Sequence, residues 1–305
     1  MGGPGSEREV SLRSGSAVAN ALSHFDDIEV IELIIQDEHF SLPPETDLAF
    51  IAIHGRFGED GQLQKILDQK GIPYTGAGLE SSSLAFNKVR SKQRFIEKGV
   101  PTPEFQTFRT FNQKSEQELR YWTEELGLSI TLPIVVKPVC EGSSVGVHIV
   151  RTREELPAAL WAVSRYGSDI LLEQYITGRE LTVGVLDDDE TLPVIEIRPK
   201  HGFYSYENKY TSGASDYLIP APINSRQTAE TQLLALAAHR ALGIEVYSRI
   251  DILMDPNGRL YVLEANTIPG MTSLSLLPQA ALQAGYSFPE LCKKIAELSL
   301  AKRQP

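Results

Sequence analysis

Four polar side chains near the end of the chain have the types and spacing of a metal site. They form two pairs, Arg249 with Asp251 and Glu264 with Asn266. Residues i and i+2 lie on one face of a strand, and a hairpin turn at 255–258 would lay the two strands side by side. Two carboxylates and an amide oxygen suit Mg²⁺, which keeps positions for phosphate oxygens. A structural salt-bridge cluster is the alternative interpretation.

A second candidate is the glycine- and serine-rich segment 141–146, which reads EGSSVG. Small residues let backbone N–H groups approach a phosphate. The spacing matches neither the Walker motif nor GxGxxG, so a flexible hairpin loop is an equally good interpretation. Lys137 ends the apolar strand expected before this segment, and its charge favours the nucleotide interpretation.

Two residues of the N-terminal part could contact a ligand. His54 follows the apolar segment 48–53, and open α/β sheets bind ligands where such strands end. A single histidine is nevertheless more often structural. Glu7 lies in the first turn of a predicted helix, where a carboxylate could simply favour the helix dipole.

The elements that must position these residues fall into three predicted domains. Apolar segments at 28–35 and 48–53 alternate with helical patterns and glycine-rich turns, which predicts a parallel α/β domain over residues 1–86. Short strands and helices predict a small α+β domain over 87–178. A catalytic domain of strands and closing helices is expected over 179–305.

Composition narrows the classes of partner. The 305 residues carry 29 Lys and Arg against 40 Asp and Glu, a net charge of −11. The sequence has no long basic run, so nucleic acid and anionic membranes are poor candidates. No apolar run approaches the roughly 18 residues of a membrane span. Without a signal pattern, and with Cys140 and Cys292 expected as reduced thiols, we expect a cytoplasmic protein.

Seven segments, taken in their order along the chain, resemble the D-alanine–D-alanine ligases of the ATP-grasp superfamily, and the resemblance covers essentially the whole chain. The matching segments are GGPGSEREVSL at 2–12, HGRFGEDG at 54–61, PYTGAG at 73–78, EGSSVG at 141–146, ENKYTSG at 207–213, RIDI at 249–252 and EANTIPGMTSLSLLP at 264–278. The resemblance implies an ATP-grasp fold behind an N-terminal parallel α/β domain. It also implies ATP-dependent synthesis of D-alanyl-D-alanine for peptidoglycan, through an acyl phosphate.

The resemblance implies a set of ATP contacts. The phosphates would meet Lys88, Lys137 and Lys209. Ser144 would contact ATP from the glycine- and serine-rich segment. Adenine and ribose would be lined by Glu173, Gln174, Ile176 and Glu180, where Gln174 replaces a lysine that many relatives carry.

The resemblance also assigns the amino-acid substrates and the metal. Glu7 would hold the ammonium of the first D-alanine, and His54 would lie near a substrate carboxylate. Two Mg²⁺ or Mn²⁺ ions would be held by Asp251, Glu264 and Asn266. Arg249 and the Gly270 backbone would face the developing oxyanion, and Ser275 and Leu276 would position the second D-alanine. Ser143 would link Glu7 to Tyr210 and so close the long polar segment 199–217 as a lid.

The resemblance leaves some questions open. A homodimer is expected. A D-alanine–D-lactate ligase, another carboxylate–amine ligase, or a non-catalytic relative are the alternatives, and Tyr210 beside Lys209 favours the dipeptide product. The family usually has an apolar strand before the opening glycines, whereas this chain begins at Met1. We therefore expect an N-terminal domain without its first strand, and a natural chain that extends upstream.

Overall fold

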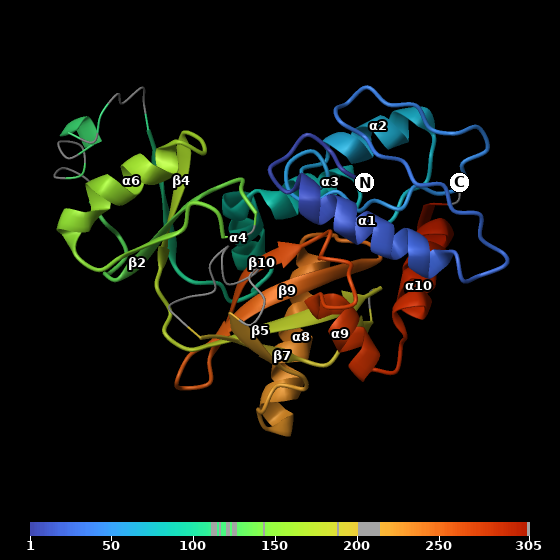
Figure 1. Ribbon diagram of the computed structural model, residues 1–305. Helices are drawn as coiled ribbons and strands as arrows, with labels where there is room; N and C mark the ends of the chain where they lie inside the picture. Colours follow the sequence, from blue (N-terminus) through green and yellow to red (C-terminus); the bar gives the residue numbers. More distant parts are fainter. Residues whose placement is uncertain are drawn as a thin grey trace.

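The chain forms three structural regions that lie side by side (Figure 1). The computed structural model describes residues 1–110, 115, 117–119, 123, 127–142, 144–187, 189–200 and 214–303. An N-terminal region, a four-stranded sheet and a six-stranded sheet follow one another along the sequence. Within the described ranges, no helix is long and apolar enough to cross a bilayer.

The N-terminal region contains three helices and two pairs of extended segments. The helices are α1 (Arg8–Leu22), α2 (Gln62–Lys70) and α3 (Leu79–Phe86). The expectation of regular strands at 28–35 and 48–53 is wrong, because these segments carry only isolated parallel bridges, Gly2 to Ile35 and Ala49 to Tyr74.

Hydrogen bonds from a side chain and from the N-terminus help to hold these extended segments together. The Ile51 N–H donates to the Thr75 hydroxyl at 3.0 Å, so a side chain replaces a ladder acceptor. The Met1 ammonium donates to the Leu33 carbonyl at 2.8 Å, and the Gly3 N–H donates to the Ile35 carbonyl at 2.8 Å. Both bridges are parallel, which is the strand direction predicted for this domain.

The four-stranded sheet is entirely antiparallel and is reached through helix α4 (Lys88–Glu97). Its strands, in the spatial order β1-β4-β2-β3, are β1 (Phe105–Arg109), β4 (Asp169–Gln174), β2 (Ile134–Pro138) and β3 (His148–Val150). The short helix η1 (Arg153–Glu155) leads into α6 (Leu156–Ser164), whose apolar face shares a core with β2 and β4. The other face of this sheet turns toward the C-terminal region.

The six-stranded sheet forms the C-terminal region and has the order β10-β9-β5-β7-β8, with β6 on β5. Its strands are β5 (Arg179–Leu186), β6 (Glu190–Thr191), β7 (Ile195–Pro199), β8 (Ser215–Leu218), β9 (Tyr247–Met254) and β10 (Leu260–Asn266). Its helices are α8 (Ser225–Ala241), α9 (Leu276–Gln283) and α10 (Phe288–Arg303).

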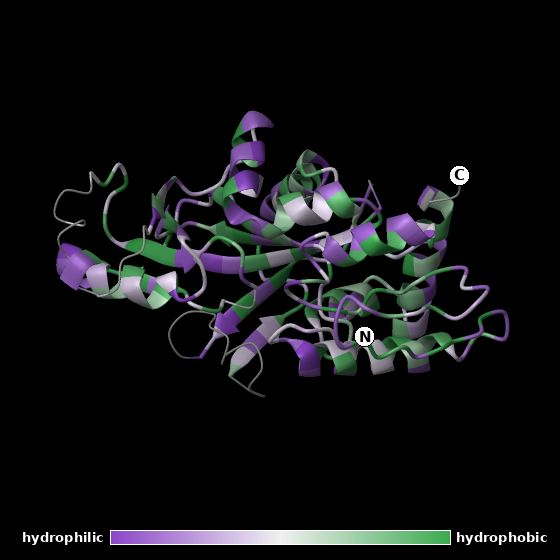
Figure 2. Cartoon of the chain, turned by 90° about the horizontal axis from the view of Figure 1, so that it is seen from above, coloured by the Kyte–Doolittle hydropathy of each residue, from purple (hydrophilic) through white to green (hydrophobic). Residues whose placement is uncertain are grey.

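Helices cover both faces of this sheet. Val183, Ile250 and Val262 share an apolar core with α8 on one face. On the other face α9, α10 and α1 form a second core. A Cβ at Gly184 would collide with Leu277, so this glycine allows α9 to approach β5 closely. Figure 2 shows the helices banded with hydrophilic and hydrophobic residues, as helices that bury one side require.

A β-bulge in β10 decides which side chains share a face with Asp251. Val262 lies opposite Ile252, but Glu264 lies opposite Asp251, so Leu263 is an extra residue in the pairing. Directly opposed residues of an antiparallel pair point to the same face. A regular register would set Glu264 opposite Ile250, in the apolar core. The bulge therefore moves the Glu264 carboxylate to the polar face.

We infer three domains from this layout, with boundaries at 86/87 and 178/179. The four-stranded sheet ends at Gln174 and the six-stranded sheet begins at Arg179, which supports the second boundary. The domains share packing, because α1 contacts α10 across the first and third. Figure 1 shows both termini on the side of the molecule that contains α1 and α10.

The register argument can be tested by deleting Leu263. Without the extra residue, Glu264 lies opposite Asp251 in a regular pairing and stays on the polar face. Deletion of Ala265 is the comparison, because it keeps the bulge and turns Asn266 into the apolar core, where a buried unsatisfied amide costs about 1–3 kcal/mol. In urea titrations, we expect the Ala265 deletion to lower the free energy of unfolding by about that amount more than the Leu263 deletion. Equal stability of the two variants would contradict this account of the bulge.

Candidate active site

A cleft of about 520 Å³ lies between the two sheets. Volumes of this size are typical of small-molecule sites. The residues predicted to bind ATP or metal that line it are Lys88, Lys137, Ser144, Glu173, Gln174, Ile176, Glu180, Asp251 and Glu264. Three further predicted residues, Ser143, Lys209 and Tyr210, lie outside the described residues. The cleft thus brings together side chains from α4, both sheets and the 141–146 segment.

Asp251 is held rigidly on the floor of the cleft. Arg249 donates to both its carboxylate oxygens, each at 3.1 Å. The Thr182 hydroxyl donates at 2.6 Å and the Asn266 amide at 3.0 Å. The sequence analysis missed Thr182, although its place two residues after Glu180 on one strand puts both on the same face.

Glu264 faces the lysine side of the cleft. Its carboxylate lies 3.1 Å from the Lys88 ammonium, which also donates to the Glu141 carbonyl at 2.6 Å. Burial opposes the charge on Lys88, but the neighbouring Glu264 outweighs burial and raises the pKa of Lys88. Lys88 is therefore a fixed cation at the edge of the cleft.

The donor set fits a hard divalent cation. Asp251 and Glu264 oppose each other across β9 and β10, and Asn266 adds an amide beside them. Among the described residues, no group of three His, Cys, Asp or Glu side chains forms a metal cluster. Two carboxylates and an amide leave coordination positions for phosphate oxygens, which is how Mg²⁺ is usually bound beside nucleotides.

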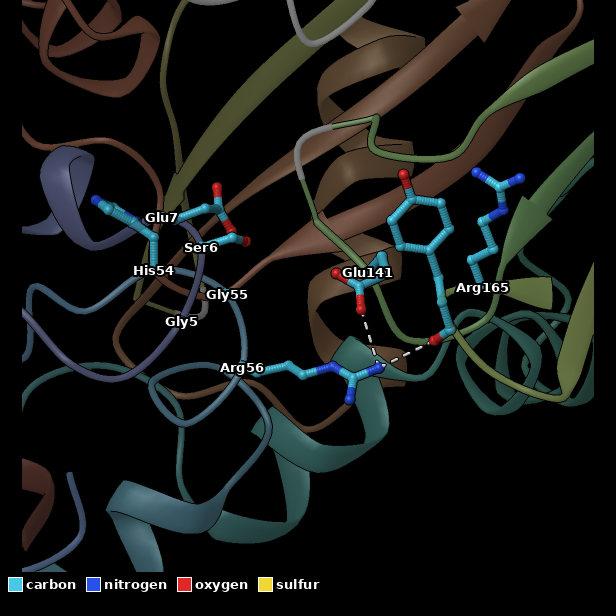
Figure 3. A pocket seen from close by; sticks show the side chains of 9 residues that line it. Gly5, Ser6, Glu7, His54, Gly55, Arg56, Glu141 and Arg165 are labelled. Atoms are coloured by element: carbon cyan, nitrogen blue, oxygen red, sulfur yellow. Dashed lines mark hydrogen bonds and ion pairs between the residues drawn. The ribbon is translucent and has the colours of Figure 1, made fainter. Parts of the chain in front are cut away.

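A smaller pocket of about 250 Å³ adjoins the cleft (Figure 3). It is lined by Gly5, Ser6, Glu7, His54, Gly55, Arg56, Glu141, Arg165 and Tyr166. Arg56 pairs with Glu141 at 2.9 Å and donates to the Tyr166 carbonyl at 3.3 Å, which ties the N-terminal region to the four-stranded sheet. Glu141 also lines the large cleft, so the two pockets meet at this residue.

Glu7 lies in a narrow slot of this pocket. It occupies the N-cap of α1 without a capping hydrogen bond from its side chain, and it is 8% exposed. A Cβ at Gly55 would collide with its carboxylate, and one at Gly142 would lie 3.1 Å from it. The two glycines thus leave room for the carboxylate, and Gly142 brings the 141–146 segment beside it.

His54 lines the same pocket, but both its ring nitrogens are engaged by protein groups. Nε2 lies 2.9 Å from the Ser14 hydroxyl and Nδ1 lies 2.9 Å from the Ile268 carbonyl. Ser14 also accepts a bond from the Met271 N–H at 3.3 Å. The ring therefore anchors the segment that contains Gly270, the predicted oxyanion donor.

The last two predicted residues begin α9. The Ser275 hydroxyl accepts a bond from the Thr272 N–H at 3.1 Å and shapes the turn before the helix. The side chain of Leu276 is buried in the core under α9. For Leu276, only the backbone at the helix N-terminus is therefore placed to meet a substrate carboxylate.

Two antiparallel sheets that enclose a lysine-lined cleft, with oxygen ligands on its floor, define an ATP-grasp ligase. Family models match by the descriptions D-ala D-ala ligase C-terminus, over residues 95–297, and D-ala D-ala ligase N-terminus, over 35–77. The chain belongs to the D-alanine–D-alanine ligase family.

Individual relatives match over nearly the whole chain. A D-alanine–D-alanine ligase of Methylacidiphilum infernorum is 45% identical over 298 residues, 98% of this chain and 93% of the relative. The Bacillus anthracis ligase solved with ATP superposes with a TM-score of 0.81 at 31% identity, covering 99% of this chain and 96% of that one. The VanG D-Ala:D-Ser ligase of Enterococcus faecalis gives 0.79 at 30%, covering 98% and 97%.

The anchoring role of Ser14 predicts a measurable loss of stability. Ser14→Ala would leave the buried His54 Nε2 and the Met271 N–H without their partner, at roughly 1–3 kcal/mol. Ser16→Ala, an exposed serine on the same helix, should stay within about 0.5 kcal/mol of the parent protein. Urea denaturation of both variants measures the difference, and equal midpoints would rule out the anchor.

Proposed function

We propose that the protein joins two D-alanine molecules into D-alanyl-D-alanine for peptidoglycan and converts ATP to ADP and phosphate. The observation that carries this proposal is the junction of the two pockets at Glu141. A lysine-lined cleft fits a triphosphate, and the small polar pocket beside it fits an amino acid. Membership of the ligase family supports the same reaction.

In the first step, a carboxylate oxygen of the first D-alanine attacks the γ-phosphorus of ATP, and ADP leaves. Glu7 would hold the ammonium of this D-alanine in the slot formed by Gly55 and Gly142. Lys88 and Lys137 would stabilise the negative charge of the phosphoryl group. The product is a D-alanyl phosphate, a carboxylate made reactive.

In the second step, the amine of the second D-alanine attacks the carbonyl carbon of the acyl phosphate, loses a proton and displaces phosphate. Arg249 and the Gly270 N–H would stabilise the oxyanion that develops. Ser275 and the backbone N–H of Leu276 would bind the carboxylate of the incoming D-alanine at the start of α9. His54 would support this step by holding the Gly270 segment.

Asp251, Glu264 and Asn266 would hold two Mg²⁺ or Mn²⁺ ions. When bound, these ions neutralise phosphate charge and orient the transferring group. The oxygen donor set on the polar face of β9 and β10 supports this assignment.

A lid and a dimer complete the proposal. An acyl phosphate must be shielded from water, so we assign this task to the segment 199–217. Ser143 would join Glu7 to Tyr210 and Lys209 would reach the phosphates, although 201–213 and Ser143 lie outside the described residues. The homodimer remains a prediction from the family resemblance.

Product analysis tests the reaction directly. Phosphate release and product mass would be measured with D-alanine, D-serine, D-lactate or L-alanine as the partner of D-alanine. We expect D-alanyl-D-alanine as the main product. The similarity to a D-Ala:D-Ser ligase makes D-serine the informative second acceptor. ATP consumption without any of these products would contradict the proposal.

Glu264→Gln tests the metal assignment. The variant keeps the shape of the side chain but removes a ligand charge, which is part of several kcal/mol of transition-state stabilisation. We expect the rate of phosphate release to fall at least about 100-fold. Glu297→Gln, an exposed glutamate on α10, is the control for charge. An unchanged rate at saturating Mg²⁺ would remove Glu264 from the metal site.

Gly55→Ala tests the slot around Glu7. Gly55 and Gly71 both have a positive φ, +71° and +67°, but only Gly55 has Glu7 against its Cβ position. Alanine at either site therefore carries a similar backbone strain of about 1 kcal/mol. We expect Gly55→Ala to raise the D-alanine concentration for half-maximal rate at least about tenfold, with little change for ATP. If Gly71→Ala has the same effect, strain and not the slot is responsible.

A further inference from the structure

The carboxylate of Glu173 lies between two lysines that come from different elements. Lys137 on β2 donates to Oε1 at 2.7 Å. Lys92 on α4 forms an ion pair with Oε2 at 2.5 Å. Burial opposes the charge on Glu173, but Lys137 and Lys92 outweigh burial and hold the pKa of Glu173 below its ordinary value. The cluster is therefore two cations around one anion.

The two lysines occupy different positions relative to the cleft. Lys137 and Glu173 line it, whereas Lys92 is 0% exposed and is absent from the described lining residues. Lys92 donates to the Thr102 hydroxyl at 2.5 Å and to the Pro103 carbonyl at 3.3 Å. Its ammonium also lies 5.4 Å from the centre of the Phe105 ring. Lys92 thus stands behind the cleft wall and cannot contact a nucleotide directly.

A buried ammonium is costly, so its presence needs a reason beyond local packing. Burial is the main influence on Lys92 and lowers its pKa to about 8, while Glu173 acts in the opposite direction. Without Lys92, the negative charge of Glu173 would be balanced by Lys137 alone. The pair would then present no net charge to an anion in the cleft.

We propose that Lys92 is a positioning residue for nucleotide binding, which neutralises Glu173 from behind so that Lys137 keeps a net positive charge toward the triphosphate. The proposal rests on the proposed function, because it takes the cleft as the ATP site. Lys92 also fixes one Glu173 oxygen, so the other holds the Lys137 ammonium in place. The part of the ligand that this charge cluster would recognise is the polyphosphate, not the nucleoside.

The test compares ATP with adenosine, which lacks the phosphates. Equilibrium binding of each would be measured by calorimetry or competition, at fixed Mg²⁺ and salt, for the parent protein and Lys92→Met. We expect ATP to bind about tenfold or more weakly to the variant, and adenosine to change less than about twofold. Lys98→Met removes the same charge from the exposed C-cap of the same helix and should change neither affinity.

A second variant guards against misfolding of Lys92→Met, whose buried Glu173 has lost a partner. Lys92→Met/Glu173→Gln contains no uncompensated anion and leaves Lys137 charged. We expect the ratio of adenosine to ATP dissociation constants to return to within about threefold of the parent value. Using this ratio removes any direct effect of Glu173 on adenine.

The outcomes separate the two proposals. No ATP binding by the parent protein would overturn the proposed function and this inference with it. ATP binding by the parent, with equal loss of ATP and adenosine in Lys92→Met or a double variant that does not recover the ratio, would overturn the inference alone. Unchanged ATP affinity in Lys92→Met would overturn it as well.

Discussion

The extra residue in β10 is the constraint on which the arrangement of the catalytic face depends. Asp251, Glu264 and Asn266 come from two strands, and they can act together only if their side chains leave the sheet on the same side. The bulge at Leu263 achieves this while Val262 stays in the core under α8. Even-numbered side chains of β10 therefore point into the apolar core before the bulge, as at Val262, and to the polar face after it, as at Glu264. Arg249 and Thr182 then lock Asp251 in place.

The apolar cores on the two faces of the six-stranded sheet leave room for this polar patch. Helices α8, α3 and α4 pack on one face, while α9 and α10 cover only part of the other and leave its end open to the cleft. The four-stranded sheet closes over that end, and Glu141 connects it to the N-terminal pocket. The proposed reaction site therefore draws residues from all three regions, and α1 packed on α10 holds the first region against the third.

Alternation along strands correctly grouped Arg249 with Asp251 and Glu264 with Asn266. The described residues that the family resemblance implied for ATP all line one cleft. The same rule also groups Val262 with Glu264, and those two lie on opposite faces, because a bulge without glycine leaves no local mark in the sequence. Lys92 did carry a signal, since it lies one helical turn after Lys88. The ion pairs of Glu173 with Lys92 and Lys137 had no signal in the sequence, because only the tertiary packing of α4, β2 and β4 brings these three residues together.

The cations of the cleft are each matched to a carboxylate, and this matching links metal binding to phosphate binding. Lys88 pairs with the same Glu264 carboxylate that a divalent ion would use. Glu264 would divide its charge between Lys88 and a bound metal ion, and the Lys88 ammonium would then be available to a phosphate oxygen. Lys137 needs no such exchange, because Lys92 already balances Glu173 from behind. The cleft would therefore contain one lysine whose ion pair changes when the metal binds and one whose ion pair is set by the protein alone, and the metal dependence of phosphate binding should act through Lys88.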